Sequence, residues 1–301
     1  MPHGINEHNF FNISEDHEKH QELLAFKANL LQNKEYDFVL LFNSRNIRRK
    51  SIPDTLLAFK TFLDHLTPEQ AQKCCIVLHT QPVDDNGTDL FAVRDMLFGD
   101  QAEHHVIFDQ GIVDSNYMNL LYNSCDGVIL LSSNEGWGLS LTEGLMCGKP
   151  IIATVTGGMQ DQFRFQDDDG QWIDFDEEFS SNHLAKYVDC GEWAYPVFPS
   201  SISIQGSPLT PYITDDRIDF REAAWMISEL YDASPDERII RGGRGREWVT
   251  SQESGMSSSN MCKNIMKSMD YLFENWEGRE PFEVIKVGPR KKKHVKYPIS
   301  Y

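Results

Sequence analysis

Residues 127–155 read GVILLSSNEGWGLSLTEGLMCGKPIIATV, and their pattern indicates the fold class. Residues 127–133 and 150–155 are short apolar runs, which are typical of parallel strands covered on both faces. Between them, residues 139–148 read as a helix that ends in glycine, and Pro150 opens the next strand. Strand, helix and strand in this order predict one unit of a parallel sheet.

The same alternation extends back through the preceding hundred residues. Further short strands are predicted over residues 37–43, 74–80 and 106–110. Helical spacing of apolar side chains predicts helices over residues 51–66, 88–98 and 115–125. The pattern as a whole predicts an α/β fold, a doubly wound, Rossmann-like parallel sheet with short connections.

The second half of the chain has a looser pattern. Residues 165–215 contain an acidic stretch and then a run rich in Pro, Ser and aromatics, which predicts an irregular insertion packed on the domain. Helices are expected after it over residues 219–233, 235–250 and 257–276. We therefore expect a linker-like segment over 1–20, one Rossmann-like domain with C-terminal helices over 21–277, and a basic tail over 278–301.

Composition and charge narrow the classes of function. The 301 residues are 40% hydrophobic and 25% charged, as in an ordinary globular protein. A net charge of -18 argues against nucleic acid as a partner of the whole surface. No apolar run approaches the ~20 residues of a membrane helix, and the first residues do not resemble a secretory signal. Six cysteines without metal-like spacing predict buried free thiols in a reducing compartment, and hence a cytoplasmic protein.

Two glutamates give the stretch its chemical character. Glu135 falls just past the carboxyl end of a predicted strand, where open α/β sheets bind ligands. Glycines at 136 and 138 would expose backbone N–H groups at a helix start, which suits an anion. Glu143 follows on the helix itself. Only a loop followed by a helix would aim both carboxylates into one cleft.

A capping role competes with this interpretation. Ser140 and Glu143 fit the S-x-x-E capping box, in which the glutamate merely ties down the start of the helix. That role leaves Glu135, the turn glycines and the Gly157-Gly158 pair past the next strand unexplained. The two roles are compatible, because a capped helix would still fix the direction of Glu143.

A basic cluster, RNIRRK at residues 45–50, follows the first predicted strand. Arg45 and Lys50 would place two cations at a strand's carboxyl end and before a helix, which suits a diphosphate. A solvated basic loop is the alternative. The topological position in an otherwise acidic protein favours phosphate binding.

Together these residues resemble the donor-binding half of the retaining GT-B glycosyltransferases of family four, which carry two glutamates separated by seven residues. Glu135 and Glu143 have that spacing, and the similarity runs through EGWGLSLTEGLMCGKPIIATVTGG. Arg45 and Lys50 match the family's phosphate-binding pair. MPHGIN at the start resembles the interdomain linker, and residues 246–269 resemble the closing helices. His3 belongs to the linker match, where a linker hydrogen bond or exposure to solvent is expected.

The resemblance implies roles for these residues. Arg45 and Lys50 would neutralise the diphosphate of a nucleotide-sugar and the charge that develops as it leaves. Glu135 would accept hydrogen bonds from hydroxyls of the donor sugar, and Glu143 would bind the ribose hydroxyls. The expected donor-binding residues are Gly136, Trp137, Gly138, Leu139, Glu143, Gly157 and Gly158. The family usually needs no metal, and no cofactor is expected beyond the nucleotide-sugar substrate.

The resemblance also implies a partner, because the family's first domain, with its acceptor site, lies outside the match. A partner chain or further sequence would supply that domain, and the chain alone would transfer sugar slowly or not at all. A non-catalytic nucleotide-sugar-binding or regulatory subunit is an alternative, and a GT-B epimerase is less favoured because its motifs differ. The basic run RKKKHVK at 290–296 offers contact with an anionic membrane, although a solvated tail is the commoner outcome.

Overall fold

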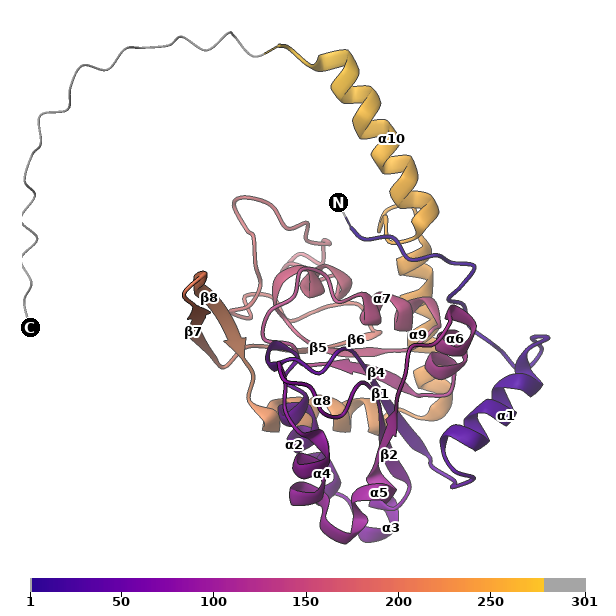
Figure 1. Ribbon diagram of the computed structural model, residues 1–301. Coiled ribbons are helices and arrows are strands. Elements are labelled where there is room, and N and C mark those ends of the chain that lie inside the picture. The colour runs from indigo at the N-terminus through magenta and orange to yellow at the C-terminus, as the bar shows by residue number, and fades with distance from the viewer. Residues whose placement is uncertain (1, 279–301) are drawn as a thin grey trace, which may run out of the picture. The chain divides into compact units, whose positions relative to one another are not determined.

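The computed structural model describes residues 2–278 and contains a six-stranded sheet (Figure 1). All its neighbouring strands are parallel, and their order is β3-β2-β1-β4-β5-β6. The strands are β1 (Phe38–Asn43), β2 (Cys74–His79), β3 (Val106–Asp109), β4 (Gly127–Leu130), β5 (Ile151–Thr154) and β6 (Ala194–Val197). This is the doubly wound order of a Rossmann-like sheet, so the predicted α/β fold is confirmed.

Helices cover both faces of the sheet. Figure 1 shows α2, α4 and α8 on one face and α6 and α7 on the other. The α-helices are α1 (His20–Leu30), α2 (Ile52–Asp64), α3 (Pro68–Ala71), α4 (Leu90–Phe98), α5 (Ala102–His105), α6 (Ser115–Asn123), α7 (Leu139–Met146), α8 (Phe220–Asp232), α9 (Pro235–Thr250) and α10 (Ser258–Asn275). The 3-10 turns are η1 (Arg48–Lys50), η2 (Gly99–Gln101) and η3 (Gly157–Gln162). The predicted helices are all present, whereas α1 and the shortest helices were not predicted.

The central strands form the core because helices exclude water from both of their faces. Residues Phe38 to Phe42 of β1 are 0% exposed, which accounts for their unbroken apolar sequence. Burial of each such side chain contributes roughly 1.5–3 kcal/mol. Cysteines 74, 75, 125 and 147 are buried and unpaired, as predicted, while Cys190 is half-buried and Cys262 is exposed.

Residues 165–193 contain no helix or strand, as expected of an irregular insertion, but the rest of the segment over 165–215 corrects that prediction. It contributes β6 to the main sheet, and β7 (Ser201–Ser207) and β8 (Thr210–Arg217) form an antiparallel hairpin. Sequence reasoning missed β6 because it has four residues and includes Pro196. The carbonyls of Trp193 and Val197 accept hydrogen bonds from the β5 side. Because alternate residues of a strand direct their backbone groups to opposite sides, the backbone nitrogen of Pro196 faces away from β5. An edge strand tolerates a proline there, because no ladder hydrogen bond is lost.

The N-terminal segment packs along the domain. The amide of Ile5 donates to the carbonyl of Met256 at 2.9 Å, and the amide of Phe11 donates to Asn119 Oδ1 at 2.9 Å. The chain divides into two units after Asn264, and the sheet belongs to the first. The basic run at 290–296 lies outside the described residues.

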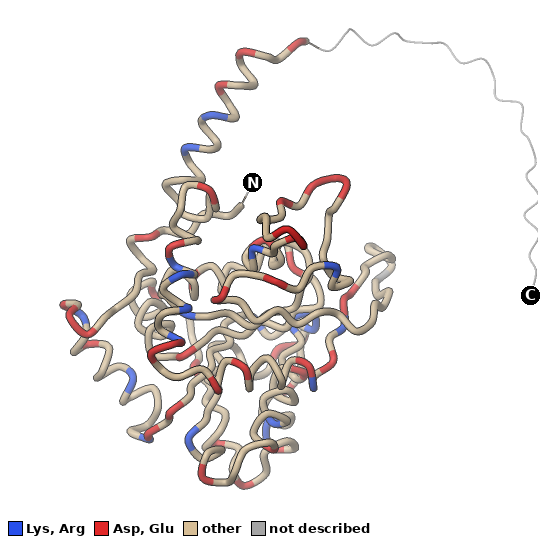
Figure 2. The backbone as a smooth tube through the Cα atoms, turned by 180° about the vertical axis from the view of Figure 1, so that it is seen from behind, with Lys and Arg blue, Asp and Glu red and all other residues tan. Residues whose placement is uncertain are grey.

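Acidic residues are distributed along the described part of the chain. Figure 2 shows Asp and Glu spread over many loops and helices, in keeping with the acidic composition. None of the helices in the described part of the chain combines the length and the apolar character needed to cross a bilayer.

Adjacent glycines on α9 provide a matched test of the packing. A Cβ at Gly242 would lie 1.9 Å from the carbonyl oxygen of Gly148, whereas a Cβ at Gly243 would meet nothing within 4 Å. Gly242→Ala is expected to lower the free energy of unfolding by about 1–3 kcal/mol, since the backbone after α7 must move. Gly243→Ala is expected to raise it by up to ~1 kcal/mol through helix propensity. Urea unfolding of both variants measures the difference, and equal effects would contradict this close approach.

Candidate functional site

A cleft of about 450 Å³ opens at the carboxyl ends of β1 and β4. The helix that follows β1 covers one face of the sheet and the helix that follows β4 covers the other (Figure 1). The chain therefore diverges at this point and leaves a crevice, which is where such sheets bind ligands. The cleft is lined by His3, Asn43, Ser44, Lys50, Glu135, Gly136, Trp137, Gly138, Leu139, Ser140 and Glu143.

The loop after β4 is held by side-chain hydrogen bonds behind the cleft. Trp137 Nε1 donates to Thr142 Oγ1 at 2.9 Å, and Thr142 Oγ1 donates to Gln162 Oε1 at 2.9 Å. Gln162 Nε2 in turn donates to the carbonyl of Trp137 at 2.7 Å. Gly138 precedes α7 with a φ of +82°, a backbone conformation that glycine adopts at little cost. The loop is thus fixed before any ligand binds.

The hairpin β7–β8 is also joined to this loop. The amide of Asp216 donates to the carbonyl of Ser133 at 2.9 Å, and Thr156 Oγ1 donates to Asp216 Oδ2 at 2.6 Å. Two strand ends, those of β4 and β5, are therefore connected through one hairpin residue.

Gly157 and Gly158 pack against the loop and do not line the cleft. A Cβ at Gly157 would lie 1.9 Å from the carbonyl oxygen of Glu135, and one at Gly158 would lie 2.2 Å from that of Gly136. The amide of Gly158 donates to the Glu135 carbonyl at 3.2 Å. These glycines set the position of the loop, and their direct contact with a donor stays a prediction.

Glu135 is the buried centre of a charge cluster. Its side chain is 7% exposed and forms ion pairs with Lys50 Nζ and Arg49 Nη1. Arg49 Nη1 also donates to the carbonyl of Asn134 at 2.9 Å. Burial lowers the pKa of Lys50, and the hydrogen bond to Glu135 opposes that shift. Two cations share one carboxylate, so the cluster carries a net positive charge in an otherwise acidic protein.

Glu143 reaches the same cleft from the second turn of α7. Its Oε2 accepts a hydrogen bond from Tyr122 Oη at 2.5 Å, and Tyr122 Oη accepts one from Asn43 Nδ2 at 2.8 Å. Burial raises the pKa of Glu143, while the Tyr122 hydroxyl and the charge of His79 act in the opposite direction. The predicted convergence of both glutamates on one cleft is therefore seen in the geometry.

The predicted capping box is wrong. Helix α7 begins at Leu139 after Gly138, and no side chain caps it. Ser140 lies inside the first turn because the left-handed glycine starts the helix two residues earlier than the S-x-x-E pattern assumes. Glu143 is consequently free of the capping role, and no side chain takes the amides at the start of α7.

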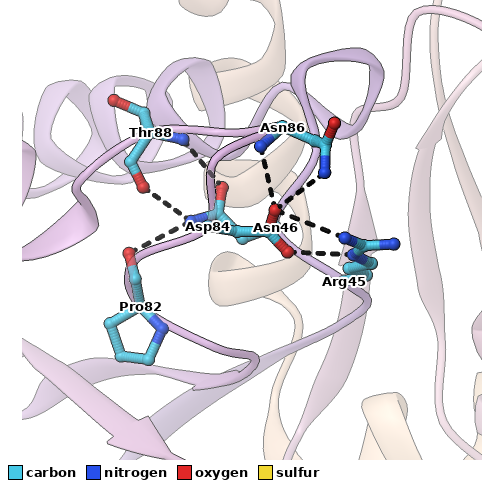
Figure 3. A network of polar contacts seen from close by, with 6 residues as sticks. All are labelled: Arg45, Asn46, Pro82, Asp84, Asn86 and Thr88. Carbon is cyan, nitrogen blue, oxygen red and sulfur yellow. Dashed lines mark hydrogen bonds and ion pairs between the residues drawn. The ribbon is translucent and has the colours of Figure 1, made fainter.

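Arg45 lies away from the cleft wall. Figure 3 shows its guanidinium against Asp84, with Arg45 Nε donating to Asp84 Oδ2 at 2.9 Å. The Arg45 side chain is 64% exposed. Beside it, Asn46 Nδ2 donates to the carbonyls of Pro82 and Thr88, which clamps the loop after β2 onto the loop after β1. The structure thus unites Lys50, the turn residues and the two glutamates, but not Arg45.

Several polar residues of the site were not identified from sequence. Arg49 lay within the predicted basic cluster and carried the same signal as its neighbours. Asn43 is the polar residue that ends an apolar strand, which is a usable signal. Tyr122 gave none, because its helical spacing reads as core. His3 stands edge-on to Trp137 with ring centroids 6.0 Å apart, at the cleft wall.

Metal ligands are not gathered in the described part of the chain. Among residues 2–278, no three His, Cys, Asp or Glu side chains are placed to hold an ion together. Metal independence of any reaction stays a prediction.

Solved structures share this fold. Sucrose-phosphate synthase from Thermosynechococcus elongatus is 20% identical with a TM-score of 0.57, over 91% of this chain and 52% of that protein. The C-terminal domain of a group 1 glycosyl transferase from Francisella tularensis is 17% identical with a TM-score of 0.54, over 82% and 97%. Anabaena HepE, solved in complex with UDP, is 14% identical with a TM-score of 0.59, over 89% and 56%.

Such identities show the fold alone. The chain spans about half the length of the synthase and of HepE, and nearly the whole of the isolated C-terminal domain. No curated protein matches the sequence at a significant level.

The sequence itself provides the family assignment. Residues 25–191, more than half of the 301, match the profile of the family described as Glycosyl transferases group 1. This range includes five of the six strands of the sheet, β1 to β5, and both glutamates of the cleft. The chain therefore belongs to the glycosyl transferases group 1 family.

Proposed function

We propose that this chain is the donor-binding half of a retaining glycosyltransferase of family four and that its cleft holds a nucleotide-diphosphate sugar. The observation that carries the proposal is the meeting of Lys50, Glu135, the start of α7 and Glu143 in one cleft. Positive charge and open helix amides suit the diphosphate, and the two carboxylates suit the donor sugar and the ribose. HepE, a structural neighbour, was solved with UDP and with UDP-glucose, which supports the same ligand class.

The diphosphate would lie between Lys50 and the start of α7. No side chain caps that helix, so the amides of its first turn and its dipole favour an anion. Lys50 and Arg49 add charge at the same place. Lys50 would stabilise the negative charge that develops on the leaving diphosphate, and Arg45 would assist after its exposed side chain leaves Asp84.

The carboxylates would hold the two sugars. A bound diphosphate competes for Lys50 and Arg49, which frees Glu135 to accept hydrogen bonds from donor-sugar hydroxyls. Glu143 uses Oε2 for Tyr122, and its Oε1 has no hydrogen-bond partner among residues 2–278. Oε1 is the atom we assign to the ribose hydroxyls.

The complete reaction would need a second domain that supplies the acceptor. The C1–O bond to the diphosphate breaks, and a bond from C1 to the acceptor oxygen forms with the same anomeric configuration. The acceptor hydroxyl gives its proton to the leaving nucleoside diphosphate. We propose that a partner chain or further sequence provides the acceptor site, that the reaction takes place in the cytoplasm, and that no metal takes part. A non-catalytic nucleotide-sugar-binding subunit is the alternative. Sugar transfer after addition of a protein that supplies the acceptor domain would distinguish a catalytic chain from a non-catalytic one.

Donor binding is tested with UDP-, GDP- and ADP-sugars by thermal shift and calorimetry. We expect at least one to raise the melting temperature, and Glu143→Ala to weaken its binding about tenfold or more, as for a hydrogen bond to a charged group. Glu69→Ala, an exposed glutamate of α3, is the matched control and should leave binding unchanged. Failure of all three sugars to bind the folded chain would refute the proposal.

Substitution of the two predicted cations separates their roles. Lys50→Ala should lower affinity for the nucleoside diphosphate by about 10- to 100-fold and leave affinity for the nucleoside unchanged, because only the phosphates meet the cation. Arg45→Ala should have a smaller effect, since its ion pair with Asp84 is exposed and must first break. Calorimetry with both ligands measures this. If Lys50→Ala lowered the affinity for the nucleoside and for the nucleoside diphosphate equally, Lys50 would not contact the phosphates.

The pH dependence of binding follows from Glu143. Burial raises the pKa of this carboxyl above its ordinary value of 4.5, and only the ionised form accepts two ribose hydrogen bonds. The affinity for the nucleotide should therefore be highest at a pH above the raised pKa. On acidification it should begin to fall at a higher pH than it would if Glu143 had an ordinary pKa. The ratio of wild-type to Glu143→Gln affinity removes the titration of the phosphates. A ratio that is constant down to pH 4.5 would contradict this role.

A further inference from the structure

A row of polar side chains lies across the carboxyl ends of three adjacent strands. Asn43 of β1 pairs in register with His79 of β2, and His79 pairs in register with Asp109 of β3. Side chains of in-register neighbours in a parallel sheet point to the same face. The proposed donor site uses only the Asn43 end of this row, through Tyr122 and Glu143.

Helix α6 supports both ends of the row. Tyr122 Oη accepts from Asn43 and donates to Glu143, as described above. Tyr117, from the first turn of the same helix, donates its hydroxyl to Asp109 Oδ1 at 2.7 Å. One rigid helix thus fixes Glu143 and Asp109 on a common frame, with His79 between Asn43 and Asp109.

The hydrogen bonds of Asp109 determine the chemical form of His79. Asp109 Oδ2 lies 2.7 Å from His79 Nδ1, and the two side chains are 11% and 13% exposed. A carboxylate only accepts, so Nδ1 carries a proton, and in the neutral tautomer this leaves the lone pair on Nε2. Nε2 has no hydrogen-bond partner among residues 2–278. His79 therefore presents an oriented acceptor that nothing in the described chain uses.

The position of His79 relates it to the nucleoside. His79 pairs in register with Asn43, which lines the cleft and is joined to Glu143 through Tyr122. If Glu143 holds the ribose, the part of the ligand beyond it on the β2 side is the base. Ile112, in the loop that follows Asp109, is a fully exposed apolar side chain.

We propose that His79, positioned by Asp109, determines base specificity by accepting a hydrogen bond from a ring N–H of the donor's nucleobase. Uracil and guanine carry such an N–H on their Watson–Crick edges, whereas adenine presents an acceptor nitrogen at the corresponding place. The site would therefore favour UDP- or GDP-sugars over ADP-sugars. The inference rests on the proposed function, because it needs a nucleotide in the cleft.

Calorimetry with UDP, GDP and ADP tests the inference on the full chain. The wild type should bind UDP or GDP more tightly than ADP. His79→Ala should reduce that preference about five- to tenfold, the size of one hydrogen bond, and leave inorganic pyrophosphate binding unchanged. His104→Ala is the control, since His104 Nε2 is exposed and bonds to the carbonyl of Gln72.

Asp109→Asn provides a sharper test of the positioning role. Tyr117 would still donate to the amide oxygen, which turns the amide nitrogen toward His79 Nδ1 and forces the proton onto Nε2. The preference should then shift toward ADP by a similar factor, and nitrogen chemical shifts of the His79 ring should report the exchanged tautomer. A merely structural role for Asp109 would change neither.

The outcomes distinguish the two proposals. A wild type that binds none of the three nucleotides overturns the proposed function and this inference with it. A wild type that binds a nucleotide, with the same base preference after His79→Ala, overturns only the role of His79.

Discussion

Lys50 and Arg49, from the turn after β1, meet the carboxylate of Glu135, from the loop after β4, across the line where the strand order reverses. A carboxylate that is only 7% exposed would be costly without partners, and removal of a partner from such a pair typically costs about 3–5 kcal/mol. The amide of Ser133 adds a hydrogen bond to the carbonyl of Arg49 at 2.8 Å. These contacts hold the two walls of the cleft at a fixed separation, and the other features of the site depend on them.

The loops after three strands then stack on one another. Because Gly157 and Gly158 have no side chains, the turn after β5 approaches the backbone of residues 135 and 136 closely. That approach, with the hydrogen bonds of Trp137, Thr142 and Gln162, leaves the start of α7 facing the cleft. The site is thus a product of backbone packing first and of side-chain charge second. Such preorganisation suits electrostatic stabilisation, since little reorganisation is needed when charge develops.

Sequence reasoning succeeded where one local property decides the structure. Buried parallel strands such as β1 are apolar throughout. The convergence of Glu135 and Glu143 on one cleft is likewise local, because a single loop and the helix that follows it position both side chains. It failed where distant partners decide. The pattern around Ser140 suits a cap, but the left-handed backbone of Gly138 starts α7 earlier. Arg49 and Arg45 look equivalent in RNIRRK, yet the turn η1 directs Arg49 to Glu135 while Asp84 holds Arg45.

The outer strand β6 has a consequence for the protein in solution. An edge strand presents unpaired backbone groups that can recruit a strand from another molecule. Pro196 lies at an outward-facing position of this short strand and has no N–H to offer. A second chain could not form a continuous ladder along it. One residue that made β6 hard to recognise in the sequence therefore also protects this edge of the sheet from edge-to-edge aggregation.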